Sequence, residues 1–230
     1  TRVVISVPSG VTEVERRAVE DAVRAAGAQE VELIEEPMAA ALGVGLPVFE
    51  ARGSMIVDIG GGTCDVAVIS LGGIAARKSI KVAGNALDEA IINYMKKTHN
   101  LLIGTITAED IKLKIGSAME YDGEAVMEVR GRNLTDGLPN AIEVTSAEIR
   151  EVLSAPVSEI ISAICETLEV TLPELAADII DKGIYITGGT SLLRGLPELI
   201  TKETKIAVHK TDMPLEAVAI GASVKLRRAR

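Results

Sequence analysis

The stretch MIVDIGGGTCDVAVI, residues 55–69, decides the fold. It predicts a strand, a tight glycine turn and a second strand. The first strand is a short apolar run, which is typical of a strand buried on both faces. Because three consecutive glycines carry no side chains, backbone N–H groups in the turn can converge on an anion. The stretch therefore predicts a phosphate-binding turn, with an ordinary glycine hairpin as the alternative.

Two polar side chains flank this turn. Asp58 lies at its mouth, where a carboxylate could hold a metal-bound water, and Thr63 adds a hydroxyl donor. A second glycine turn, GGTS at 188–191, follows another short apolar strand at 184–187 and is expected to open a helix. Backbone donors at a helix start favour an anion there as well. The pair of turns favours phosphate binding, although the second turn alone could serve only to pack a helix.

The composition limits the class of protein. The chain has 230 residues, 47% of them hydrophobic and 2% aromatic, which predicts an aliphatic core in one large or two small domains. A net charge of −9 argues against a basic nucleic-acid surface. No apolar run approaches the roughly 18 residues of a spanning helix, and no signal-peptide pattern is present, so we expect a cytoplasmic protein. Cys64 and Cys165 match no metal spacing and are expected as reduced, buried thiols.

Strands and helices alternate along the first part of the chain. Thr12 and Glu15 form a capping box that predicts a helix to about Ala26. Pro37 suits the first turn of another helix. The alternation indicates an α/β layer. The expected strands are 3–7, 31–34, 55–59, 64–69 and 74–82, and the expected helices are 12–26, 38–42 and 84–98.

The second part of the chain is more varied. A helix is expected at 108–118 and a β-ribbon at 124–132 and 138–145, turning near Asp136 and Gly137. A long helical pattern at 146–172 contains Pro156, which predicts a kink or a break. A short strand at 206–208 and a last helix at 215–228 complete the prediction.

Four stretches together resemble a known superfamily. They are VISVPSGVTEVERRAV (4–19), LIEEPMAAALG (33–43), MIVDIGGGTCDVAVISLGGI (55–74) and GIYITGGTSLLRGLPELI (183–200). In this order they resemble the actin, heat-shock-chaperone and sugar-kinase ATPases, and most closely the MreB family of bacterial actin homologues, which determine rod shape. The resemblance covers nearly the whole chain. It implies an α/β, actin-like ATPase fold of the ribonuclease-H-like type.

The resemblance also implies roles for particular residues. Asp58 would orient Mg²⁺ through water, and Glu36 would polarise the water that attacks ATP. From the residues alone, Glu36 could equally be an acid that stabilises a helix start, and Glu109 with Lys112 could be a solvated pair. The remaining implied contacts are Gly60, Gly61, Gly62 and Thr63 to the phosphates, Gly188, Gly189 and Thr190 to the adenosine, and Glu109 and Lys112 beside the base and ribose.

The chain departs from the family pattern in several places. Cys64 and Asp65 stand where the family usually has Thr and Glu, Asn85 replaces an acid, and Thr190 replaces a glycine. The family's first phosphate loop, of the type GIDLGTAN, is not in this sequence, which begins inside an apolar run at Thr1. We therefore expect a complete second half and a truncated first half. From the chain itself we expect weak or undetectable ATP binding and no ordered filaments.

The implied subdomains follow the family. Residues 1–50 and 212–230 would form part of a first large subdomain, 51–90 and 146–211 a second, and 91–145 an inserted small one. The implied function is a filament-forming protein of bacterial cell shape that binds ATP and Mg²⁺ and hydrolyses ATP slowly. Implied partners are further copies of itself, the inner membrane and the cell-wall-synthesis machinery. A chaperone-type or sugar-kinase-type ATPase, and a fragment with only structural surfaces, are the alternatives.

Overall fold

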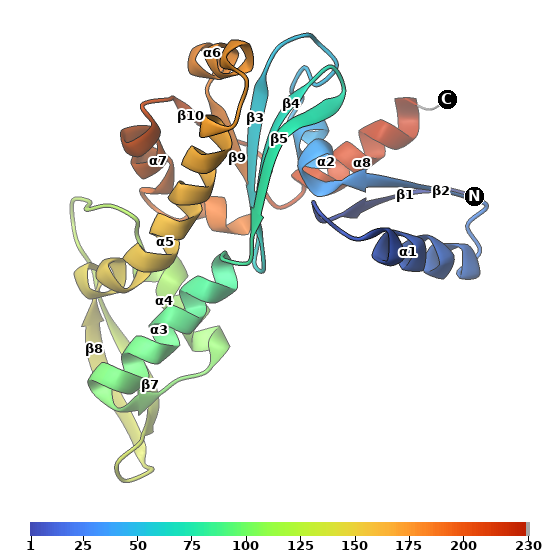
Figure 1. Cartoon of the computed structure of the whole chain (residues 1–230). Helices are drawn as coiled ribbons and strands as arrows, with labels where there is room; N and C mark the ends of the chain where they lie inside the picture. The colour runs from blue at the N-terminus through green and yellow to red at the C-terminus, as the bar shows by residue number, and fades with distance from the viewer. Residues whose placement is uncertain (229–230) are drawn as a thin grey trace.

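The computed structural model describes residues 1–228, so the end of the predicted 212–230 segment, residues 229–230, lies outside the described residues. The described chain forms a five-stranded, a three-stranded and a two-stranded sheet with helices packed between and around them (Figure 1). This arrangement is the α/β fold that the alternation of strands and helices predicts.

The central sheet carries both glycine turns. Its strand order is β10-β9-β3-β4-β5, and β3 runs antiparallel to β4 but parallel to β9. Because β3 and β9 are parallel, the turns that follow them lie at the same edge of the sheet. The strands are β3 (Ser54–Ile59), β4 (Cys64–Ser70), β5 (Gly73–Ile80), β9 (Ile184–Thr187) and β10 (Val208–Lys210).

Strand β3 is buried on both faces, as predicted. Met55, Val57 and Ile59 belong to the larger hydrophobic core, and Ile56 belongs to a smaller core on the other face. The larger core is covered by α3 (Gly84–His99), α5 (Ser146–Glu169), α6 (Pro173–Lys182) and α7 (Leu196–Thr204). The smaller core is covered by α2 (Glu36–Gly43) and α8 (Ala217–Arg228).

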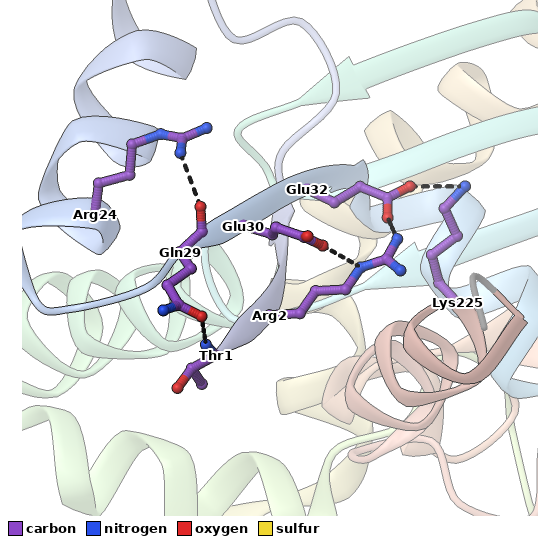
Figure 2. A network of polar contacts seen from close by, with 7 residues as sticks. All are labelled: Thr1, Arg2, Arg24, Gln29, Glu30, Glu32 and Lys225. Atoms are coloured by element: carbon purple, nitrogen blue, oxygen red, sulfur yellow. Dashed lines mark hydrogen bonds and ion pairs between the residues drawn. The ribbon is translucent and has the colours of Figure 1, made fainter.

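The first and last segments of the chain pack together. Strand β1 (Arg2–Val7) pairs in parallel with β2 (Glu30–Glu35), and α1 (Glu13–Ala25) begins with the predicted capping box. Figure 2 shows the Glu32 carboxylate between Arg2 of β1, at 2.7 Å, and Lys225 of α8, at 3.0 Å. The division into subdomains stays a prediction, and this contact supports the grouping of the two ends.

A small antiparallel sheet lies beyond α3 (Figure 1). Its order is β6-β7-β8, formed by β6 (Leu101–Leu102), β7 (Val126–Asn133) and β8 (Pro139–Thr145), with α4 (Thr105–Ile115) packed against α3. The predicted ribbon is confirmed. Its turn contains Gly137 at φ +76°, where the backbone amide donates to the carbonyl of Asn133.

Several predicted boundaries are wrong. The last helix begins at Ala217 rather than residue 215. In a helix that began at 215, the Pro214 carbonyl would accept a helical hydrogen bond. Here it accepts hydrogen bonds from the Thr187 hydroxyl and the Gly188 amide instead. Of the two expectations for Pro156, a kink or a break, the break is wrong, because α5 continues to Glu169 along its buried face. The helix expected at 108–118 spans Thr105–Ile115, and the strand expected at 206–208 spans Val208–Lys210.

Two further sequence observations can be placed on the fold. Cys64 is a buried free thiol as predicted, but Cys165 is only half-buried because its helix face borders an open groove. Among the described helices, none is long and apolar enough to cross a membrane.

Candidate functional site

A cavity of about 610 Å³ lies where the two glycine turns meet. The starts of α2 and α3, one side of α4 and the segment before α8 complete its walls. It brings together nine of the predicted site residues: Glu36, Asp58, Gly60, Gly61, Glu109, Lys112, Gly188, Gly189 and Thr190. Gly62 and Thr63 belong to the same β3–β4 turn but do not line the cavity.

Hydrogen bonds fix the first glycine turn in place. The Gly60 carbonyl accepts from the Thr190 hydroxyl at 2.7 Å and from the Gly84 amide at 3.1 Å. The Gly61 carbonyl accepts from the Asn85 amide at 2.7 Å. A Cβ on Gly84 would lie 2.8 Å from the Thr190 hydroxyl oxygen, so only glycine allows this approach. The turn is therefore held by α3 and by the second turn, unlike an isolated hairpin.

The second glycine turn lies directly against Asp58. Gly188 has φ +84°, and a Cβ there would lie 2.6 Å from the Asp58 Oδ1. The expected longer helix at this turn is wrong: a single 3-10 turn, Gly189–Leu192, forms instead. Gly195, at φ +75°, separates that turn from α7, because a left-handed residue does not continue a helix.

Two acids face the cavity without a cation. Burial, followed by the negative charges of Glu36 and Asp65, raises the pKa of Asp58 to about 7. Burial, and then the charge of Asp65, raises the pKa of Glu36 as well. No ion pair is recorded for either acid within residues 1–228. Acids in such surroundings suit proton acceptance near neutral pH or contact with a cation.

The opposite wall is formed by α3 and α4. The Lys112 ammonium contacts the Asp88 carboxylate at 2.8 Å and donates to the Gly84 carbonyl at 3.2 Å. Its side chain is only 12% exposed, so Lys112 does not form the solvated pair with Glu109 that the spacing allowed. Glu109 lies one turn earlier on α4 and is exposed at the cavity rim.

The family model described as MreB/Mbl protein matches residues 1–230. The chain belongs to the MreB/Mbl family. It is 52% identical over 225 residues to the cell shape-determining protein MreB of Escherichia coli K12, covering 98% of this chain and 65% of that protein. The chain thus spans about two thirds of the length of this MreB relative.

Solved structures show the same fold. MreB5 of Spiroplasma citri bound to ADP superimposes with a TM-score of 0.96 at 39% identity, over 99% of this chain and 69% of that one. The same protein bound to AMPPNP matches equally well. A MamK double helical filament, at 22% identity and a TM-score of 0.81, matches 99% of this chain and 68% of that one, and shows the fold alone. The predicted actin-like fold is confirmed.

Sequence reasoning missed several residues of this candidate site. Asp65 is 2% exposed and its Oδ1 has no hydrogen-bond partner, although it lies opposite Asp58 in the β3–β4 register. The alternation of β4 could have placed it on the Asp58 face. Asp88 was missed because its pairing depends on how α3 packs against α4. The other unpredicted lining residues are Gly84, Asn85, Leu113, Leu192, Pro214, Leu215 and Val218.

Proposed function

We propose that this chain forms the nucleotide-binding face of an ATP-dependent, filament-forming cell-shape protein. One observation carries the proposal: two glycine turns, 130 residues apart, meet at one cavity and are joined by the Thr190–Gly60 hydrogen bond. Membership of the MreB/Mbl family supports it, as do the ADP and AMPPNP bound to MreB5 of Spiroplasma citri. The same membership favours a filament protein over a chaperone-type or sugar-kinase-type ATPase.

In this proposal, each wall of the cavity binds a different part of the nucleotide. Backbone amides of 61–63 bind the phosphates, because glycine side chains do not block their approach, whereas the Gly60 amide closes the turn by donating to the Thr63 carbonyl at 2.9 Å. The second turn, at Gly188, Gly189 and Thr190, binds the adenosine, with Glu109 and Lys112 beside the base and ribose. The half-buried Asp88 carboxylate holds Lys112 in place for that contact.

The acids fit a magnesium ion that accompanies the phosphates. Carboxylate oxygen is a preferred donor for Mg²⁺, which keeps several of its waters in proteins. Residues 1–228 contain no group of three or more His, Cys, Asp or Glu side chains arranged to hold a metal. As the family resemblance implies, Asp58 would contact the ion through water. When bound, Mg²⁺ neutralises phosphate charge.

Glu36 is the proposed proton acceptor. It stands at the first position of α2, on the cavity wall, and its raised pKa makes it a better base than an ordinary glutamate. Its carboxylate would orient a water and take its proton during hydrolysis. We propose slow turnover, because the cleft has to close around the nucleotide first.

Self-association and cell shape are the wider part of the proposal. The E. coli relative is named a cell shape-determining protein, and filaments in the cytoplasm, with contacts to the inner membrane and the cell-wall-synthesis machinery, are the corresponding proposal here. Sedimentation of a protein that carries this chain tests self-association. Mg-AMPPNP should increase the pelleted fraction, and an unchanged fraction would contradict it.

A chemical-shift titration tests nucleotide binding by the chain itself, because it detects weak as well as strong binding. Mg-AMPPNP should shift the backbone amides of 60–63 and 188–190 and leave those of β7 unchanged. Inorganic phosphate alone should shift 60–63 but not 109–112. Shifts confined to other parts of the chain would refute the proposed site.

A further inference from the structure

A second cavity, of about 530 Å³, lies between β2 and β5 and shares no lining residue with the first. Its lining includes the apolar side chains of Met38, Leu42, Phe49 and Ile74. Consecutive acids separate the two cavities: Glu36 lines the first, whereas Glu35 lines the second. This second cavity, named the β5 groove below, has no part in the proposed nucleotide site.

One wall of the β5 groove is the edge of a sheet. Strand β5 is the last strand in the order β10-β9-β3-β4-β5, so within the described chain it has a strand partner on one side only. Its residues Gly73, Ile74, Ala75, Ala76 and Arg77 line the groove in succession. The backbone N–H and C=O groups of β5 that do not pair with β4 are therefore available for hydrogen bonding along this wall. Such an edge is a template for an added strand.

The rim of the β5 groove is basic. Arg16 of α1 and Arg77 of β5 share the single carboxylate of Glu35, at 3.7 Å and 2.8 Å. Lys225 also lines the groove and contacts Glu32 (Figure 2). Three cations and one anion line the groove, a net charge of +2, whereas the whole chain carries −9. Because the groove is positively charged although the chain as a whole is negatively charged, it favours an acidic ligand.

We propose that the β5 groove binds an extended segment of a partner protein, in which acidic and aliphatic residues alternate, as an added strand along β5. An extended chain points successive side chains to opposite faces. Aliphatic residues would then reach Met38, Phe49 and Ile74, and acidic residues would reach Arg16 and Arg77. The main chain would pair with the free edge. The proposal is independent of nucleotide binding.

The bulge in β5 fits this use of the edge. The register with β4 shifts between Val68 and Ile69, so that Ala75 is the extra residue. Ile74 thereby packs against the smaller core while Ala76 is buried in the larger one. A bulge also limits uncontrolled pairing of an exposed edge, which favours a selective partner over any strand.

Peptide binding to the 230-residue chain tests the proposal. The probes are fluorescein-labelled, acetylated octapeptides of alternating Glu and Val or alternating Lys and Val, followed by fluorescence anisotropy. The Glu/Val peptide should bind at least roughly tenfold more tightly than the Lys/Val peptide. A Glu/Val peptide N-methylated at alternate residues should lose binding, because the donors for strand pairing are gone. Equal binding of the acidic and basic peptides, or full binding of the methylated one, would overturn the proposal.

Variants locate the peptide. Arg77→Glu should weaken Glu/Val binding by roughly fivefold or more, and Arg77→Gln by less. Arg130→Glu is the matched control, because Arg130 forms an exposed pair with Glu128 on β7, and it should leave binding unchanged. Circular dichroism establishes that each variant is folded. Unchanged binding by both Arg77 variants would refute the site.

Hydrogen exchange provides a readout that does not depend on any variant. The Glu/Val peptide should slow exchange of the amides at 73–77 and leave those of β7 and β8 unaffected. Protection elsewhere would contradict the proposal. Protection of 73–77 that rises with protein concentration in the absence of peptide would assign the groove to a second copy of the chain instead, and would overturn the proposed partner.

Discussion

Thr190 donates its hydroxyl hydrogen to the carbonyl oxygen of Gly60 at 2.7 Å, across 130 residues of chain. The bond joins the two glycine turns at the point where the parallel strands β3 and β9 end. Thr190 is buried, so the bond is shielded from water. The two turns therefore form one unit, and a change in either should affect the other.

Replacement of Thr190 by valine tests this unit. Thr190→Val keeps the shape of the side chain but leaves the Gly60 carbonyl with one donor fewer, which should lower the free energy of unfolding by about 1 kcal/mol. Thr190→Ser retains the hydroxyl and is the control. Urea unfolding measures both. A loss for Thr190→Ser with none for Thr190→Val would show that the methyl group, and not the hydrogen bond, matters.

Gly188 should tolerate no side chain. Its φ of +84° strains any other residue, and a Cβ would lie 2.6 Å from the Asp58 Oδ1. Gly188→Ala should therefore destabilise the protein by roughly 1–3 kcal/mol. Gly62→Ala is the control, since Gly62 has no positive φ and a Cβ there meets nothing within 4 Å. Its effect should stay within about 0.5 kcal/mol. Equal effects would refute the close approach.

The pH dependence of stability should reflect Asp58. Folding raises its pKa from 3.8 to about 7, so between these values the unfolded chain loses the proton while the folded chain keeps it. This contribution to the free energy of unfolding should therefore fall as pH rises from about 4 to 7, and stay constant above that range. Asp58→Asn should remove the decrease. Urea unfolding at pH 5 and pH 8 measures the difference between the two proteins.

Carbon-13 NMR of the Asp58 carboxyl gives the direct measurement without nucleotide. The midpoint should lie near 7. A midpoint near 4 would show that water reaches the carboxyl freely and that neighbouring acids do not affect it.

Much of this fold could be predicted because the decisive signals are local. The apolar run of β3, the glycines after it and the capping box at Thr12 each depend on neighbours in sequence. The errors occurred where contacts with distant segments of the chain determine the local structure. Pro214 reads as a helix start, yet its carbonyl is bound to the second glycine turn.

The residues of the candidate site also fall into two groups, those that a local motif predicts and those that only contacts between distant segments bring to the site. Asp58 and Gly60 could be named from one motif, whereas Asp88 becomes part of the cavity only through Lys112 on another helix. Asp65 is buried without a partner for its Oδ1, and burial is not visible in a sequence. The β5 groove could not be predicted either, because it requires the edges of two sheets to lie close together.

Hydrogen exchange should differ along the chain. Helix α1 has no buried residue, whereas Met55, Ile56, Val57 and Ile59 of β3 are fully buried. Opening of α1 therefore exposes little apolar surface, and its amides should exchange at least roughly tenfold faster than those of 55–59. Equal protection of the two segments would show that the first part of the chain unfolds only together with the central sheet.

Glu36 offers the sharpest test of the proposed chemistry. In a protein that carries this chain and hydrolyses Mg-ATP, Glu36→Gln keeps the size of the side chain but removes the proton acceptor. Phosphate release should slow by roughly 10²–10⁴-fold, while AMPPNP binding changes little. Glu35→Gln is the matched control, because the adjacent carboxylate lines the other cavity and pairs with Arg77. Its hydrolysis rate should stay close to that of the unchanged protein. Equal rates for all three proteins would reduce Glu36 to an acid that stabilises the start of α2.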